Sequence, residues 1–152
     1  MPDSPRKSYT DIDGRILTCY YFTSGETVYG NDRFEKHRLG GPAYANSVYE
    51  CWYKNDDLHR TNGPAVTNRN DCNEDFNEYW VNGQELDYIK FQLQFYKLSQ
   101  KEIIQLLYRK NAASWNNLNA IKLALLHRGL TPLKISQIIE RTNIINALTK
   151  TL

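Results

Sequence analysis

A seven-residue motif occurs twice in the first half of this chain and limits how that half can fold. The segment "HRLGGPA" at 37–43 returns as "HRTNGPA" at 59–65, so five of the seven positions are identical across a spacing of 22 residues. A repeat with a short fixed period is typical of a protein built from stacked supersecondary units. The alternative is a catalytic signature that the chain uses twice.

Three segments around the motif share one pattern, an aromatic residue and an aliphatic residue with a turn pair between them. The segments are "FTSGETV" at 22–28, "WYKNDDL" at 52–58 and "WVNGQEL" at 80–86. The expected turn pairs are Ser24-Gly25, Lys54-Asn55 and Asn82-Gly83. Gly and Asn tolerate the positive φ that two-residue hairpin turns require, so each segment is predicted to be a β-hairpin. Trp52 and Trp80 then occupy equivalent positions, which we expect to be buried against the Gly-Pro-Ala corners.

The Gly-Pro-Ala end of each motif favours a stiff corner that leads into a strand. Proline fixes its own φ and pushes the preceding residue to extended backbone. The His and Arg before it can bond to backbone groups at the corner or stack on a neighbouring aromatic ring. The residues that we expect to be structural parts of the repeat are His37, Arg38, Gly41, Pro42, Trp52, His59, Arg60, Gly63, Pro64 and Trp80.

A functional interpretation of the two histidines is a metal-binding or acid–base pair formed by His37 and His59. Chemistry of that kind needs an acidic or nucleophilic partner at a fixed spacing from each histidine, and no such partner recurs with them. The motif is duplicated together with its whole hairpin. We therefore interpret both histidines as corner residues of the repeat.

The run "HRLGGPA…WYKNDDLHRTNGPA…WVNGQEL" resembles the MORN-like repeats, particularly the HRxxGPA variety met in small proteins of phages and large viruses and in some bacterial proteins. The resemblance covers roughly residues 37–86, with "CYYFTSGETV" at 19–28 as a degenerate first unit. It implies a strip of β-hairpins that serves as a non-catalytic binding or scaffold surface.

The chain departs from a regular array in an insertion between the second motif and the last hairpin. Fourteen residues separate Ala65 from Trp80, whereas 8 separate Ala43 from Trp52. The acidic tip of the insertion, residues 71–78, is either a contact loop or a solvated excursion.

The second part of the chain changes to a helical pattern after Leu86. Ser99 and Glu102 have the spacing of a capping box, Gly129 fits the C′ position of a helix, and Thr131-Pro132 fits the start of another. The pattern predicts four or five short helices. We therefore expect an α+β protein, with an antiparallel hairpin-repeat domain at 1–87 and an all-helical domain at 88–152.

The formal net charge of +2 conceals a division between these halves. Residues 1–87 contain 9 Lys and Arg against 15 Asp and Glu, a net charge of −6, whereas residues 88–152 contain 10 against 2, a net charge of +8. Such asymmetry indicates either a segment that binds a polyanion or two halves that attract each other.

The C-terminal stretch "LLHRGLTPLKISQIIERTNIINALTKTL" resembles a helix-turn-helix, with a turn at "ERTN" (140–143) and a recognition helix at 143–152. In that arrangement the core residues are Ile135, Ile138, Ile144 and Leu148. Asn reads adenine, and Lys or Arg holds phosphate. The residues that we expect to bind nucleic acid are Lys122, Arg128, Lys134, Arg141, Asn143, Asn146 and Lys150.

Other classes of function lack sequence support. Cys19, Cys51 and Cys72 contain no C-x-x-C pair, so free thiols in a reducing cytoplasm are expected rather than disulfides or a zinc knuckle. Apolar runs are too short to span a bilayer. Without a phosphate loop, a nucleophile elbow or an H-E-x-x-H helix, we expect no enzyme activity, metal, cofactor or small-molecule substrate.

The sequence thus predicts a non-catalytic interaction protein, a small phage or viral accessory protein that binds and modulates, by inhibition, a host macromolecule. The expected partner is a host or viral protein, and the expected location is the cytoplasm, that of the host if a phage encodes the chain. The alternative is a regulator that binds nucleic acid through residues 88–152.

Overall fold

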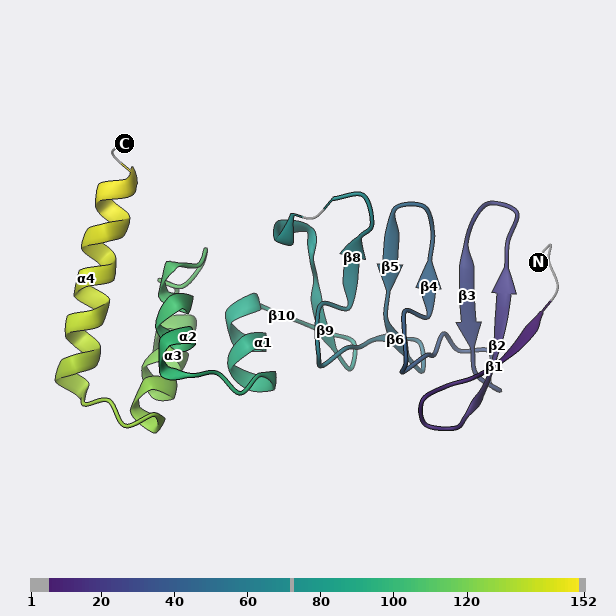
Figure 1. Cartoon of the computed structure of the whole chain (residues 1–152), viewed down its shortest axis with the longest axis horizontal. Coiled ribbons are helices and arrows are strands. Elements are labelled where there is room, and N and C mark those ends of the chain that lie inside the picture. The colour runs from purple at the N-terminus through teal and green to yellow at the C-terminus, as the bar shows by residue number, and fades with distance from the viewer. Residues whose placement is uncertain (1–5, 72, 151–152) are drawn as a thin grey trace. The chain divides into compact units, whose positions relative to one another are not determined.

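The computed structural model describes residues 6–71 and 73–150 of this α+β protein (Figure 1). The chain divides into two compact units at the Leu86–Asp87 bond, one residue before the boundary expected from the sequence. The first unit, the β unit, is an antiparallel sheet with short hairpins, and the second, the helical unit, contains four α-helices within the described residues. The expected fold class is confirmed.

One antiparallel sheet of six strands forms the body of the β unit. Its strands, in spatial order, are β1 (Lys7–Thr10), β2 (Ile16–Tyr21), β3 (Thr27–Gly30), β4 (Tyr44–Ala45), β5 (Tyr49–Cys51) and β8 (Val66–Asn68). The short hairpins are β6 (Tyr53–Lys54) with β7 (Asp57–Leu58), and β9 (Tyr79–Val81) with β10 (Gln84–Leu86). Strands β2, β3, β4, β5 and β8 stand side by side, with the β2–β3 and β4–β5 turns at one end of the strands and the short hairpins near the opposite end (Figure 1).

All three predicted hairpins are present, but only Asn82-Gly83 forms its turn as expected. In the first hairpin the N–H of Phe22 donates to the carbonyl of Glu26, so the loop consists of residues 23–25 rather than the pair Ser24-Gly25. The second turn pair was placed one residue too early. Lys54 pairs with Asp57, so the loop of the second hairpin is Asn55-Asp56, with φ of 49° and 67°. Asp, like Asn, can adopt positive φ. The prediction considered only Gly and Asn for such positions, so it did not include Asp56 in the turn. The acidic insertion forms a short 3-10 helix, η1 (Glu74–Phe76).

Trp52 and Trp80 are not equivalent, which corrects the expected alignment of the repeat. The N–H of Arg38 donates to the carbonyl of Tyr53, and that of Arg60 donates to the carbonyl of Trp80, so Trp80 matches Tyr53. Trp52 therefore matches Tyr79, and the two tryptophans lie on opposite faces because a shift of one residue along a strand reverses the side chain. Both are half-buried rather than buried.

The "FTSGETV" segment also differs from the other two hairpins in the repeat. It contains the β2–β3 turn, where Tyr21 pairs with Thr27. This turn lies at the same end of the strands as the β4–β5 turn. Tyr29 is the residue before the first motif that matches Trp52. The carbonyl of Tyr29 accepts a hydrogen bond from the N–H of His37, and the carbonyl of Trp52 accepts one from the N–H of His59. The matching short hairpin is therefore the segment around the Gly30–Lys36 bridge.

The helical unit follows its predicted start and stop signals closely. Its helices are α1 (Tyr88–Phe95), α2 (Gln100–Gln105), the 3-10 helix η2 (Leu106–Tyr108), α3 (Trp115–His127) and α4 (Pro132–Lys150). Ser99 and Glu102 form the predicted capping box, and Gly129 has φ of +90° after α3. The core of this unit contains Ile89, Leu98, Ile103, Leu106, Leu107, Ala112, Ile121, Leu125, Leu130 and Ile135.

The expected helix-turn-helix is wrong, because α4 continues without a break through 140–143. No Gly or Pro occurs in that stretch, so no residue there stops the helix. Ile135 is buried as expected, but Ile144 and Leu148 are 56% and 61% exposed and are not core residues. Thr142 is buried in their place, and its hydroxyl donates to the carbonyl of Ile138. The last two residues of the expected recognition helix, 151–152, lie outside the described residues.

Candidate functional site

Each repeated motif holds its arginine flat against an aromatic ring. The guanidinium carbon of Arg60 lies 3.9 Å from the centroid of the Trp52 ring, and one nitrogen donates to the Pro64 carbonyl at 3.1 Å. In the first motif, Arg38 lies 4.1 Å from the ring of Tyr29. A planar guanidinium combines such stacking with directed hydrogen bonds, which the ammonium of lysine cannot do.

The glycine of each motif makes room for the stacked arginine. A Cβ on Gly41 would lie 2.7 Å from the guanidinium carbon of Arg38, and a Cβ on Gly63 would lie 2.8 Å from that of Arg60. Both distances are shorter than van der Waals contact permits. The alanines that end the motifs, Ala43 and Ala65, are fully buried.

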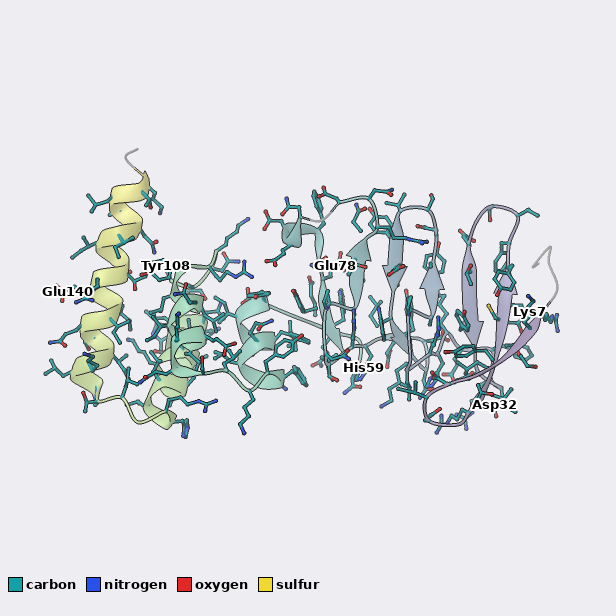
Figure 2. The ribbon with its side chains drawn as sticks, viewed as in Figure 1. Lys7, Asp32, His59, Glu78, Tyr108 and Glu140 are labelled. Carbon is teal, nitrogen blue, oxygen red and sulfur yellow. The ribbon has the colours of Figure 1, made fainter. Side chains whose placement is uncertain are left out.

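Each motif histidine accepts a hydrogen bond from the turn of the following short hairpin. The Nδ1 atom of His37 accepts from the N–H of Asn55 at 3.2 Å, and that of His59 accepts from the N–H of Asn82 at 3.1 Å. For His59, an accepting Nδ1 requires the neutral ring with its proton on Nε2. Burial is the main cause that lowers the pKa of His59, and the nearby Lys54 charge lowers it further. His59 lies at the end of the strands where the short hairpins are (Figure 2). Among the described residues, no group of three or more His, Cys, Asp and Glu side chains is arranged to hold a metal.

The sheet register places a row of aromatic and aliphatic side chains on one face. Paired residues share a face, and the pairs Tyr20–Val28, Val28–Tyr44, Tyr44–Cys51 and Cys51–Val66 extend this row across five strands. Tyr53 follows Cys51 by two residues, and Trp80 follows by two residues Glu78, which bridges to Val66, so both side chains lie on the same face. We call this set the open face; it consists of Tyr20, Val28, Tyr44, Cys51, Tyr53, Val66 and Trp80. Every member is half-buried, and the buried residues Ala43, Ala65 and Tyr79 lie on the opposite face.

Carboxylates lie along the border of the open face. The Tyr44 hydroxyl donates to Glu26 at 3.2 Å, and the Trp80 indole N–H donates to Glu78 at 2.8 Å. The ammonium of Lys36 lies 5.0 Å from the centroid of the Tyr53 ring. The open face is therefore an aromatic surface with its polar atoms already oriented.

The free thiol on the open face is not activated for nucleophilic chemistry. Burial is the main cause that raises the pKa of the Cys51 thiol, and the Glu78 charge raises it further. A thiol with a raised pKa is protonated at neutral pH and is a weak nucleophile. Cys19 is also free, and it is buried. Cys72 lies outside the described residues.

The helical unit contains a hollow of about 600 Å³ between the segment that follows α2 and the second half of α4. We call it the basic groove; its polar lining consists of Tyr108, Arg109, Lys110, Asn111, Thr142, Asn143, Asn146, Thr149 and Lys150. None of its described lining residues is Asp or Glu. The guanidinium carbon of Arg109 also lies 4.0 Å from the centroid of the Tyr88 ring, which fixes one wall of the groove.

The structure divides the seven residues expected to bind nucleic acid among different surfaces. Asn143, Asn146 and Lys150 line the basic groove. Lys122 lines a separate hollow of about 460 Å³, to which Asn143 also contributes. The remaining three, Arg128, Lys134 and Arg141, are exposed and line neither hollow.

Sequence reasoning missed Arg109, Lys110 and Asn111 as groove residues. Their run "RKN" lies in a connection more than 30 residues before the Asn143 face of α4, so only tertiary packing brings the two segments together. The signal available in the sequence was Asn111, a residue type that readily adopts left-handed backbone at turns, and in the structure it does so with φ of 66°.

Comparisons of this chain with protein-family models, with curated proteins and with solved structures find no match. Among the described residues, no helix combines the length and the apolar character needed to cross a membrane.

Proposed function

We propose that this protein is a non-catalytic interaction protein that binds a protein partner through the open face. The observation that carries the proposal is the register of Tyr20, Val28, Tyr44, Cys51 and Val66, which lines up half-buried side chains across five strands. Tyrosine and tryptophan are enriched at protein interfaces because they bury a large area at a small entropic cost. A row of this kind offers several such anchors on one rigid sheet.

Charge indicates the chemistry of the partner. Residues 1–87 carry a net charge of −6, and Glu26 and Glu78 are held at the border of the open face. A partner with an apolar surface bordered by Lys and Arg is complementary to this arrangement, and complementary charge raises the rate of association. The partner of this proposal is therefore a protein with a basic border around an apolar patch.

The geometry of the motifs supports a structural rather than a catalytic role for the repeat. His37 and His59 each accept a backbone N–H through Nδ1, and Arg38 and Arg60 each stack on a ring. These groups position the short hairpins beside the sheet. The resemblance of the HRxxGPA repeat to proteins of phages and large viruses supports a host protein as the partner, bound in the cytoplasm and inhibited by occlusion of its surface.

The test compares two double variants of the full chain as bait in a nuclease-treated lysate, with cross-linking and mass spectrometry. Tyr20→Ser with Tyr53→Ser removes two anchors of the open face. Phe34→Ser with Trp115→Ser is the matched control, because both residues are exposed aromatics outside that face. We expect one protein to cross-link to β2–β5 of the parent and of the control, and to be lost from the open-face variant. Equal recovery with all three baits would contradict the proposal, as would cross-links confined to other surfaces.

Self-association is a separate outcome of the same test. Light scattering of the parent and of the open-face variant measures the molar mass of each in solution. A dimer that dissociates only in the open-face variant would show that the face binds a second copy, and the proposal of a foreign partner would then be wrong.

A further inference from the structure

The basic groove gathers cationic side chains of a unit whose net charge is positive. Residues 88–152 carry a net charge of +8, and Arg109, Lys110 and Lys150 converge on the groove. A hollow that is lined by cations and by no carboxylates attracts anionic ligands, because its walls concentrate the electric field of the cations.

The groove also carries groups that can contact a base. Asn143, Asn146 and Lys150 follow one another at spacings of three and four along α4, so their side chains share one face of the helix. An Asn amide presents a donor and an acceptor side by side, as the edge of a base requires. Tyr108, at the end of η2, is 44% exposed and also lines the groove (Figure 2). Its ring offers a stacking surface for a base.

The shape of the site distinguishes between nucleic-acid ligands. Duplex readers insert a protruding helix into the major groove, whereas the amides of Asn143 and Asn146 face a hollow beside an uninterrupted α4. Unpaired bases can turn outward and enter a hollow of this kind. A volume of about 600 Å³ lies within the usual range of ligand pockets.

We propose that the basic groove is a second binding site, separate from the open face, that takes single-stranded nucleic acid. Lys110 and Lys150 contact phosphates, Tyr108 stacks on a base, and Asn143 and Asn146 bond to base edges. An acidic protein segment would use the cations of the groove but would leave the ring and the two amides without a role.

The test measures binding of the full chain to fluorescein-labelled oligothymidylate and oligouridylate of about twelve nucleotides, by anisotropy at several salt concentrations. Lys110→Ala with Lys150→Ala removes two groove cations. Lys97→Ala with Lys134→Ala is the matched control, because it removes the same charge from exposed positions outside the groove. We expect the groove variant to lose roughly tenfold or more in affinity, and its log–log salt slope to become shallower by about 1.4, whereas the control stays within about threefold.

Tyr108 variants separate nucleic acid from an acidic protein as the ligand. Tyr108→Ala should lower affinity about tenfold without changing the salt slope, and Tyr108→Phe should keep the parental affinity because it retains the ring. Polyglutamate of equal charge should compete poorly. Four results would each overturn the proposal: no binding by the full chain at low salt, equal losses in both lysine double variants, tighter binding of a duplex than of a single strand, or full displacement by polyglutamate.

Discussion

The guanidinium carbon of Arg60 lies 3.9 Å from the centroid of the Trp52 ring, and Gly63 lies so close that a Cβ there would be 2.8 Å from the same carbon. Arg38 and Gly41 repeat this arrangement with Tyr29 as the ring. The motif is therefore a three-part contact in which the arginine covers the aromatic residue, the glycine leaves space and the proline carbonyl accepts a hydrogen bond. Trp52 is half-buried, with Arg60 over its ring.

Gly63→Ala should destabilise the β unit by about 1 to 3 kcal/mol, because its Cβ displaces the Arg60 guanidinium from Trp52. Chemical denaturation followed by tryptophan fluorescence measures this free energy of unfolding. In an Arg60→Ala background the same change should cost much less, since the side chain that it displaces is absent. Strictly additive losses in the double variant would contradict the three-part contact.

Asp11→Asn should destabilise the chain by about 1 to 3 kcal/mol at pH 7. The buried carboxylate of Asp11 accepts backbone N–H groups of Leu39 at 2.6 Å and Gly40 at 2.8 Å, and so ties the β1–β2 loop to the first motif. An Asn side chain can accept only through one oxygen. The control is Asp13→Asn, an exposed neighbour paired with Arg15, which should change stability by less than about 1 kcal/mol.

The same contact predicts a pH dependence with a defined sign. Burial by itself would raise the pKa of Asp11. The carboxylate accepts hydrogen bonds from three backbone N–H groups, and because their combined effect is larger than that of burial, the pKa is lowered. The charged form is thus favoured in the folded state. The stability advantage over Asp11→Asn should be complete above the ordinary aspartate pKa of about 3.9 and should disappear as pH falls through the lowered value. An advantage that grows on acidification would refute this assignment.

His59 should make the β unit less stable as the solution is acidified from pH 7.5 to pH 5. Burial lowers its pKa, and a proton on Nδ1 would remove the hydrogen bond from the N–H of Asn82. A histidine with a lowered folded pKa stabilises the fold above its ordinary pKa of about 6.5, and this contribution is lost as pH falls through the folded pKa. His59→Gln keeps an acceptor without titrating, so denaturation at the two pH values should show a smaller change for this variant than for the parent.

Arg141→Pro tests the continuity of α4. Arg141 is exposed in the middle of the helix, where a proline removes a backbone hydrogen bond and costs about 3 kcal/mol or more. Circular dichroism should show reduced helix content and a lower midpoint of unfolding. The control is Arg141→Ala, which should leave both unchanged within error. A proline variant as stable as this control would favour a turn at 140–143 and restore the helix-turn-helix interpretation.

Local signals predicted the elements of this fold well where one or two residues decide the backbone. The Asn82-Gly83 pair forms the predicted turn, and the Ser99–Glu102 capping box opens α2. The predicted register of the repeat was wrong by one residue. Trp52 and Trp80 occur in similar sequence segments, but they lie one position apart in their hairpins. The turn predicted at 140–143 is absent from α4. That prediction followed a resemblance to the helix-turn-helix, although no residue at 140–143 stops a helix.

The sequence by itself determined that the first part of the chain folds as antiparallel hairpins and the second as capped helices, since turn residues and hydrophobic period act over a few positions. Only the tertiary structure decided which side chains share a surface. The open face depends on strand register from Tyr20 to Trp80, and the basic groove on the packing of Lys110 beside Asn143. Both surfaces join residues separated by tens of positions, and their proximity is fixed by the burial of core side chains on other faces of the same elements.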